Sequence, residues 1–313
     1  MREFKGYVHG VDLGGWISQC PPTMEHYKEF IKEEDFANIA SWGLDHVRIP
    51  VDYELLEDDK GNPREGGMEI LKNAVSWAGK YGLNVVIDLH KTPGYSFDWD
   101  ENKVGFFDSP ELQDRFYKLW DRIAFEFKDL SDRVAYELLN EVTEPKYSPV
   151  WNDIAENCIK RIRTVAPNTY ILVGSYWNNS ISALPDLREP YDDKIVYNFH
   201  CYEPLLFTHQ GASWVKDMAP DFRCEFTETE EFFEKMVEGA VKLAEERKVP
   251  LYCGEYGVIN LADVNETLKW YKTFLSVLDK YKIGRAAWSY KSMSFGLIDD
   301  HMKPIFEEVK KLL

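Results

Sequence analysis

The chain has 313 residues, of which 44% are hydrophobic and 29% are charged. This length and composition are typical of a globular protein with a large core, and they exclude a disordered or fibrous chain. The formal net charge of −17 opposes binding to nucleic acid, to anionic membranes and to anionic substrates, whereas a neutral sugar chain is compatible with it.

The first residues, Met-Arg-Glu-Phe-Lys-Gly, lack the apolar stretch of a signal peptide, and no run of about 18 apolar residues follows. We therefore expect no membrane span and a cytoplasmic protein, although the mature form of a secreted protein would have the same features. The five cysteines are widely spaced and form no C-x-x-C pair, which favours free thiols over a zinc or redox site. We expect a monomer that needs no metal and no cofactor.

Short apolar runs rich in β-branched and aromatic residues alternate with longer amphipathic segments. The short runs are typical of buried parallel strands. Eight are predicted, at Tyr7–Leu13, Asp45–Val51, Asn84–His90, Arg133–Asn140, Thr169–Gly174, Lys194–His200, Pro250–Glu255 and Arg285–Ser289. Helical spacing marks segments between them, among which are Met68–Tyr81, Glu111–Phe127, Trp151–Val165, Glu230–Lys248 and Asn265–Tyr281.

Strand–helix alternation repeated about eight times indicates either a barrel or a doubly wound sheet. The sequence has no G-x-G-x-x-G and no G-x-x-x-x-G-K phosphate loop, which favours the barrel. We therefore predict an α/β fold, a (β/α)8 barrel of the TIM type, forming a single catalytic domain over residues 1–313. A long connection at residues 202–229 follows the sixth strand and should overhang the site.

Catalytic groups of such barrels lie at the carboxyl ends of the strands. Here these ends are nearly all polar or aromatic: Asp12, Arg48, His90, Asn140, Glu141, His200, Tyr202, Glu255 and Trp288. Two carboxyl groups stand out, Glu141 after the fourth strand and Glu255 at the end of the seventh. A carboxyl group beside an apolar core is costly unless it has partners or a function, and structural salt bridges to Arg48 are the alternative interpretation.

Two carboxyl groups facing one cleft suit glycoside hydrolysis, in which one donates a proton to the leaving oxygen and the other, ionised, attacks the anomeric carbon. Their environments must separate their pKa values. Arg48 could keep one of them ionised through charge-assisted hydrogen bonds, and that negative charge would help the other to keep its proton.

The sequence resembles glycoside hydrolase family 5 over nearly its whole length, and most of all the family's small clostridial endoglucanases. The matching segments are Gly10-Val-Asp-Leu-Gly-Gly-Trp16, His46-Val-Arg-Ile-Pro50, Asp88-Leu-His90, Tyr136-Glu-Leu-Leu-Asn-Glu141, Val196-Tyr-Asn-Phe-His200 with Tyr202, Tyr252-Cys-Gly-Glu-Tyr-Gly257 and Ala287-Trp-Ser-Tyr290. The opening Gly-Gly-Trp also occurs in exo-1,3-glucanases of the family.

The resemblance implies a retaining mechanism in which Glu141 is the acid/base and Glu255 the nucleophile. It also implies that Asn140 hydrogen-bonds the sugar 2-hydroxyl and that Arg48 lies beside Glu255.

The same resemblance implies that His90 and His200 hold hydroxyl groups and carboxylates, that Tyr202 touches the nucleophile and that Trp288 forms the floor under the sugar. Each histidine, and Trp288, could instead be an ordinary core residue. Lys91 stands where relatives often have a second histidine, which puts one sugar contact in doubt.

Other positions carry weaker expectations. Trp99, Phe106 and Phe107 follow the third strand and could either line outer sugar subsites or anchor their loop. His46 and His26 are interpreted as surface residues and are given no role.

The predicted activity is an endo-β-glucanase, similar to cellulases, that cuts β-1,4 or mixed-linkage glucan and accepts polymer or oligosaccharide. An exo-acting β-glucosidase or exo-1,3-β-glucanase of the same family is the alternative. From other classes, a non-hydrolytic barrel enzyme would need a late phosphate loop, and a sugar-binding protein without activity would lack one of the two Glu residues. Serine and zinc hydrolases are excluded because G-x-S-x-G and H-E-x-x-H are missing.

Overall fold

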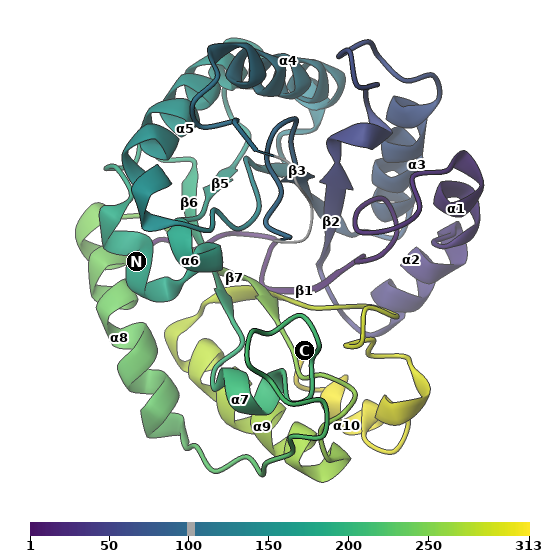
Figure 1. The fold of residues 1–313 in the computed structure, drawn as a ribbon, viewed down its shortest axis with the longest axis vertical. Helices are drawn as coiled ribbons and strands as arrows, with labels where there is room; N and C mark the ends of the chain where they lie inside the picture. The colour runs from purple at the N-terminus through teal and green to yellow at the C-terminus, as the bar shows by residue number, and fades with distance from the viewer. Residues whose placement is uncertain (99–103) are drawn as a thin grey trace.

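The computed structural model describes residues 1–98 and 104–313, so Trp99 lies outside the described residues. Within them, parallel strands pair in chain order and close into a barrel, with the first strand beside the last (Figure 1). The strands are β1 His9–Asp12, β2 His46–Asp52, β3 Asn84–Lys91, β4 Val134–Glu137, β5 Ile171–Val173, β6 Ile195–Cys201, β7 Leu251–Tyr256 and β8 Gly284–Ala287. The predicted barrel and all eight predicted strands are confirmed.

Helices surround the barrel as a ring (Figure 1). The long ones are α3 Gly67–Lys80, α4 Pro110–Phe127, α5 Ser148–Arg163, α8 Glu230–Arg247 and α9 Val264–Tyr281, which confirm the five predicted helical segments. The shorter ones are α1 Met24–Glu29, α2 Glu33–Ser41, α6 Tyr176–Asn179, α7 Leu205–Thr208 and α10 Phe306–Val309. Of the described residues, none belongs to a helix long and apolar enough to cross a bilayer.

Local sequence sets the start of the longest helices. The Ser109 side chain accepts a hydrogen bond from the Leu112 amide, and Pro110 takes the first helical position of α4, where its missing N–H costs nothing. Asp263 caps α9 in the same way, accepting from the amides of Asn265 and Glu266. These bonds satisfy first-turn amides that have no partner inside the helix, and so mark where each helix begins.

The regular ladder of β4 is shorter than predicted. Its pairing ends at Glu137 rather than at residue 140. The next residues still bond to both neighbouring strands, from the Leu138 amide to the Leu172 carbonyl at 3.2 Å and from the Asn140 amide to the Leu89 carbonyl at 3.1 Å. The chain then turns at Glu141, whose φ of 44° lies in the left-handed region.

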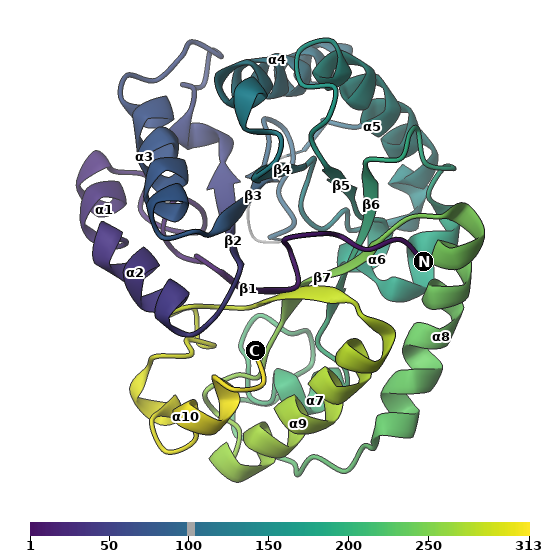
Figure 2. The same ribbon diagram turned by 180° about the vertical axis from the view of Figure 1, so that it is seen from behind.

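The N-terminal segment closes the end of the barrel where the strands begin. Figure 2 shows this segment running across that end. Phe4 and Tyr7 stack with ring centroids 4.2 Å apart, and they pack against residues that point inward from the strands. The last residues lie at the same end, where the Leu312 carbonyl accepts from Arg285 Nη2 at 2.7 Å. The opposite end, where the strands finish, is open.

The interpretation of His46 as a surface residue is wrong. His46 is fully buried inside the barrel, and its ring bonds to Asp45 Oδ1 and to the Tyr252 hydroxyl, each at 2.6 Å. In a barrel strand the inward and outward faces are both covered, so a polar residue there gives no alternation from which exposure could be inferred.

Candidate active site

A cleft of about 1140 Å³ opens at the carboxyl ends of the strands, where the barrel fold predicts the site. Most of the predicted site residues line it: His90, Asn140, Glu141, Tyr202, Glu255 and Trp288. Arg48 and His200 lie beneath them and touch the two glutamates. The long connection after β6 also contributes, through Leu205, His209 and Trp214, as predicted for an overhanging loop.

Glu141 and Glu255 face each other across this cleft. One ligand atom from each of Glu141, His200 and Glu255 lies within 4.8 Å of the others. Two carboxyl groups about 5–5.5 Å apart are typical of retaining glycosidases, whereas inverting enzymes leave about 6.5–9.5 Å for a water molecule. The spacing therefore suits direct attack by one carboxylate on a sugar carbon.

Glu141 is held in an uncommon backbone conformation. A left-handed non-glycine residue costs on the order of 1–3 kcal/mol and persists only where its surroundings impose it. Here the Tyr95 hydroxyl donates to the Glu141 carbonyl at 2.7 Å and accepts from the Thr143 amide at 2.9 Å. These bonds fix the turn that directs the Glu141 side chain into the cleft.

Arg48 organises the floor of the site. It is fully buried, and its guanidinium nitrogens reach four carboxyl groups at 2.7 to 3.1 Å. The four are Asp12, Asp88, Glu137 and Glu255. A buried guanidinium is stable only with such partners, and its planar fork fixes the direction of each of them.

Three hydrogen bonds orient Glu255 and Asn140. Arg48 Nη1 donates to Glu255 Oε1 at 2.8 Å, and the Tyr202 hydroxyl donates to Glu255 Oε2 at 2.9 Å. Arg48 Nη2 donates to Asn140 Oδ1 at 2.9 Å. The Asn140 oxygen is therefore already bonded. The buried Asn140 Nδ2 has no partner among the described residues, so it can donate to a ligand in the cleft.

Burial raises the pKa of Glu141 to about 7 and the pKa of Glu255 to about 7. A negative charge on Glu141 would raise the pKa of Glu255 further. The direct contacts decide which group ionises first. Glu255 receives bonds from a cation and a hydroxyl, so it is the better site for the charge, and Glu141 is the better site for the proton.

His200 lies between the two carboxyl groups. Its Nδ1 is 2.8 Å from Glu141 Oε1 and 3.5 Å from Glu255 Oε2, while its Nε2 faces the Asn179 amide nitrogen at 3.3 Å. Burial lowers the pKa of His200 to about 4, so the ring is neutral near pH 7. Because Asn179 Nδ2, the atom that faces the ring, can only donate, Nε2 accepts and the ring proton sits on Nδ1, directed at the glutamates.

His90 and Trp288 form one wall of the cleft. Their rings are parallel, with centroids 5.8 Å apart, and His90 Nδ1 lies 2.5 Å from Asp88 Oδ2. Trp288 lies against the loop after β1, where a Cβ on Gly14 would come within 2.9 Å of the indole. The glycine in the Gly-Gly-Trp motif is therefore needed for the indole to reach its place.

Residues 11–294 match the protein family described as Cellulase (glycosyl hydrolase family 5). The chain belongs to glycosyl hydrolase family 5. It is 46% identical to cellodextrinase A of Ruminococcus flavefaciens, over 91% of this chain and 86% of that protein. It is 36% identical to endoglucanase C of Acetivibrio thermocellus, over 100% of this chain and 98% of that protein. A solved hyperthermophilic endo-β-1,4-glucanase in complex with substrate superposes with a TM-score of 0.84 at 25% identity, covering 98% of this chain and 97% of that chain.

The site of this family 5 enzyme also contains residues to which the sequence analysis gave no role. Glu137 and Asp88 complete the shell of Arg48, and Asn198 Nδ2 donates to Glu137 Oε1 at 2.8 Å. Each stands inside a recognised motif, so the motifs could have indicated them. Asn178 was also missed: its Nδ2 donates to Glu141 Oε2 at 2.9 Å, and it stands outside the segments that carry the family resemblance.

Lys91 and the aromatic residues after β3 take distinct positions. Lys91 lines the cleft, is nearly buried and pairs with Asp98 Oδ2 at 2.8 Å, so a cation stands at the position of the second histidine of the resemblance. Phe106 and Phe107 are buried and pack edge to face against each other. Of the two interpretations, loop anchoring is the one that fits them.

The trio of Glu141, His200 and Glu255 has the spacing of a metal site, although it was expected to hold none. Its chemistry fits a cation poorly, because His200 Nδ1 carries a proton and the Arg48 guanidinium already binds Glu255. We expect dialysis against EDTA to leave the rate of glucan hydrolysis unchanged. A loss of activity that zinc or calcium restores would contradict this expectation.

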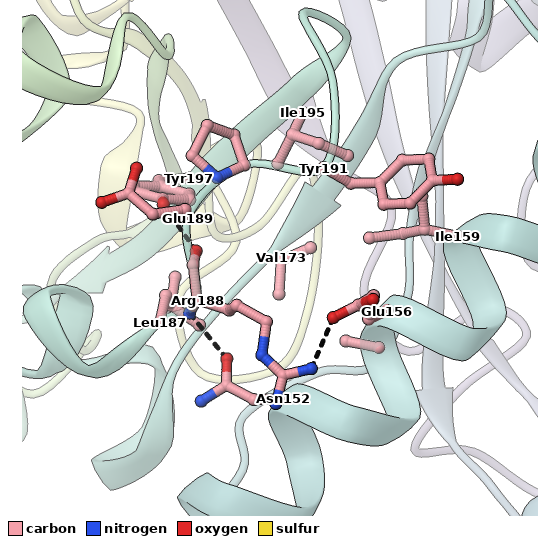
Figure 3. A pocket seen from close by; sticks show the side chains of 12 residues that line it. Asn152, Glu156, Ile159, Val173, Leu187, Arg188, Glu189, Tyr191, Ile195 and Tyr197 are labelled. Atoms are coloured by element: carbon pink, nitrogen blue, oxygen red, sulfur yellow. Dashed lines mark hydrogen bonds and ion pairs between the residues drawn. The ribbon is translucent and has the colours of Figure 1, made fainter.

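A second, smaller cavity of about 230 Å³ lies on the outer side of the barrel, between α5 and the strands β5 and β6 (Figure 3). Several of its polar groups are already paired: Arg188 bonds to Glu156, and Asn152 Oδ1 accepts from the Arg188 amide at 2.7 Å. Glu141 and Glu255 lie in the larger cleft instead.

Proposed function

We propose that the protein is a retaining endo-β-glucanase that hydrolyses β-1,4 or mixed-linkage glucan, with Glu141 as acid/base and Glu255 as nucleophile. The observation that carries the proposal is the pair of facing carboxyl groups, with ligand atoms within 4.8 Å and the Arg48 guanidinium on Glu255. This arrangement supplies both chemical roles in one cleft and separates their protonation states.

In the first step, the ionised Glu255 attacks the anomeric carbon as the bond from that carbon to the leaving oxygen breaks. Glu141 transfers its proton to the leaving oxygen, so a neutral alcohol departs. Arg48 and Tyr202 hold the attacking carboxylate in place before the reaction, which lowers the entropic cost of reaching the transition state.

In the second step, water attacks the same carbon and the bond to Glu255 breaks. Glu141, now ionised, takes the proton from the water, and Glu255 leaves as a carboxylate. Two displacements at one carbon restore the original configuration. His200 supports both steps because its Nδ1 proton is directed at the glutamates, whichever of them carries the charge.

Other residues would hold the sugar. Asn140 Nδ2, buried and without a protein partner among the described residues, is placed to donate to the 2-hydroxyl, a contact that strengthens in the transition state. The indole of Trp288 offers an apolar face for the sugar ring, and His90 offers a polar edge beside it.

The substrate can be long or short. The large cleft favours a polymer bound across it, whereas the similarity to a cellodextrinase favours soluble cello-oligosaccharides as a second class of substrate. Both share the β-1,4 linkage, so the difference lies in chain length.

A time course of product sizes tests this proposal. The enzyme is incubated with carboxymethyl cellulose, barley mixed-linkage glucan, laminarin, mannan and cellobiose, and Glu255→Gln serves as the inactive control. We expect mid-sized oligosaccharides early in the reaction, from cellulose or barley glucan. Release of glucose alone, from laminarin or cellobiose, would replace internal cutting by an exo-acting glucosidase.

A further inference from the structure

Asn178 occupies a particular place beside the proposed acid/base. Its Nδ2 donates to Glu141 Oε2 at 2.9 Å, and it lines the cleft that holds the reacting groups. The other carboxyl oxygen, Oε1, is 2.8 Å from His200 Nδ1, and the ring of His200 is in turn held by Asn179. Two adjacent asparagines therefore reach the two oxygens of Glu141, one directly and one through His200.

The backbone around Asn178 is bent toward the loop that carries Glu141. Trp177, Asn178 and Asn179 have φ values of 52°, 55° and 56°, three successive left-handed residues. The amide of Trp177 bonds to the Thr143 carbonyl at 3.1 Å, and the amide of Asn178 bonds to the Val142 carbonyl at 3.0 Å. These backbone bonds join the loop after β5 to the residues that follow Glu141. They hold the side-chain amide of Asn178 opposite Glu141 Oε2.

We propose that Asn178 is a positioning residue that stabilises the ionised form of Glu141 and so favours the second, water-activating step. This inference rests on the proposed function. An amide nitrogen can donate a hydrogen bond but cannot accept one, so its contact with Oε2 strengthens when Glu141 loses its proton. Glu141 must be protonated for the first step and ionised for the second. A donor on Oε2 stabilises the ionised form relative to the protonated form, and so favours the second step.

Other groups act on the same carboxyl, and the test must separate their effects. Around Glu141 lie Arg48 from β2, Glu137 from β4, His200 from β6, Glu255 from β7, and Asp98 after β3. All of these stay in place when Asn178 is changed. The hydrogen bond from Asn178 opposes the burial that raises the pKa of Glu141, so its loss raises that pKa further.

The variant for the test is Asn178→Gly, because glycine adopts a φ of 55° without strain. With p-nitrophenyl β-cellobioside, the basic limb of the pH profile of kcat/KM reports loss of the proton from Glu141. We expect this limb to move to a higher pH by about half a pH unit. The acid limb, which reports Glu255, should move less. With 2,4-dinitrophenyl β-cellobioside, whose second step limits kcat, the acid limb of kcat should also move up.

The matched control is Trp177→Gly, which has nearly the same backbone conformation and an exposed side chain. It should leave the limbs of both profiles in place. An equal shift in this control would assign the effect to the loop backbone and overturn the proposal, and so would an unmoved basic limb in Asn178→Gly. A general loosening of the site would lower the rates without moving the limbs.

A second variant, Asn178→Asp, places an acceptor opposite Oε2 and keeps the left-handed preference. It should move the basic limb of kcat/KM further than glycine does, and a smaller shift than that of glycine would contradict the proposal. Failure of the proposed function has a different signature. If Glu141→Ala kept the basic limb of the wild-type pH profile, Glu141 would not be the acid. Both the role of Glu141 and the role of Asn178 would then be contradicted.

Discussion

Replacing Glu255 by glycine should lower kcat on β-glucan by about 10⁴-fold or more, because the proposed nucleophile is lost. Sodium azide should restore part of the activity on an aryl β-cellobioside. The small anion fills the space left by the carboxylate and attacks the anomeric carbon from the same side, so the product should be an α-glycosyl azide.

The configuration of that product, measured by NMR, distinguishes a nucleophile from an acid/base at position 255. A β-glycosyl azide would mean that azide had entered opposite an intact nucleophile, and Glu255 would then be the acid/base. Circular dichroism should accompany the assay, because Arg48 loses one of its four carboxyl partners in this variant. The three that remain, Asp12, Asp88 and Glu137, are expected to keep the guanidinium paired and the barrel folded.

Replacing Glu141 by alanine should affect substrates unequally. For a natural glucan or a poor leaving group, kcat/KM should fall by about 10²–10⁴-fold, because the leaving oxygen must then depart without a proton. For 2,4-dinitrophenyl β-cellobioside, whose leaving group is already a stable anion, kcat/KM should change little. On that substrate kcat should still fall, since Glu141 is also the base of the second step.

A plot of log kcat/KM against the pKa of the leaving group is the measurement for this variant. It should be much steeper for Glu141→Ala than for the wild type. A parallel loss on every substrate would mean that the side chain supports the site in some other way. Azide provides a further control, because here it should give a β-glycosyl azide by attacking the intermediate in the second step.

The fold could be predicted because its determinants are local. Short continuous apolar runs, separated by amphipathic helices and without phosphate loops, leave few arrangements other than the barrel. The boundaries were less predictable. The run that ends at Asn140 was predicted as one strand, yet β4 stops pairing at Glu137, ahead of the turn at Glu141 that a contact from Tyr95 holds in place.

The candidate site could be predicted in outline for a similar reason. Barrel topology brings strand ends together, so Arg48, Glu141, His200 and Glu255 meet although they are far apart in sequence. The sequence could not predict which hydrogen-bond partners hold each of these residues. The contact of Asn178 with Glu141 requires three successive left-handed residues, a conformation for which the sequence has no glycine to signal it.

The two ends of the barrel differ in what they carry. Phe4 and Tyr7 seal the end where the strands begin, and the carbonyl of Leu312 is bonded there as well, while the cleft opens at the other end. Both chain termini therefore point away from the substrate. Attachment to a solid support, or fusion to another protein, at either terminus would hold the cleft outward, toward a polymer too large to diffuse around the enzyme.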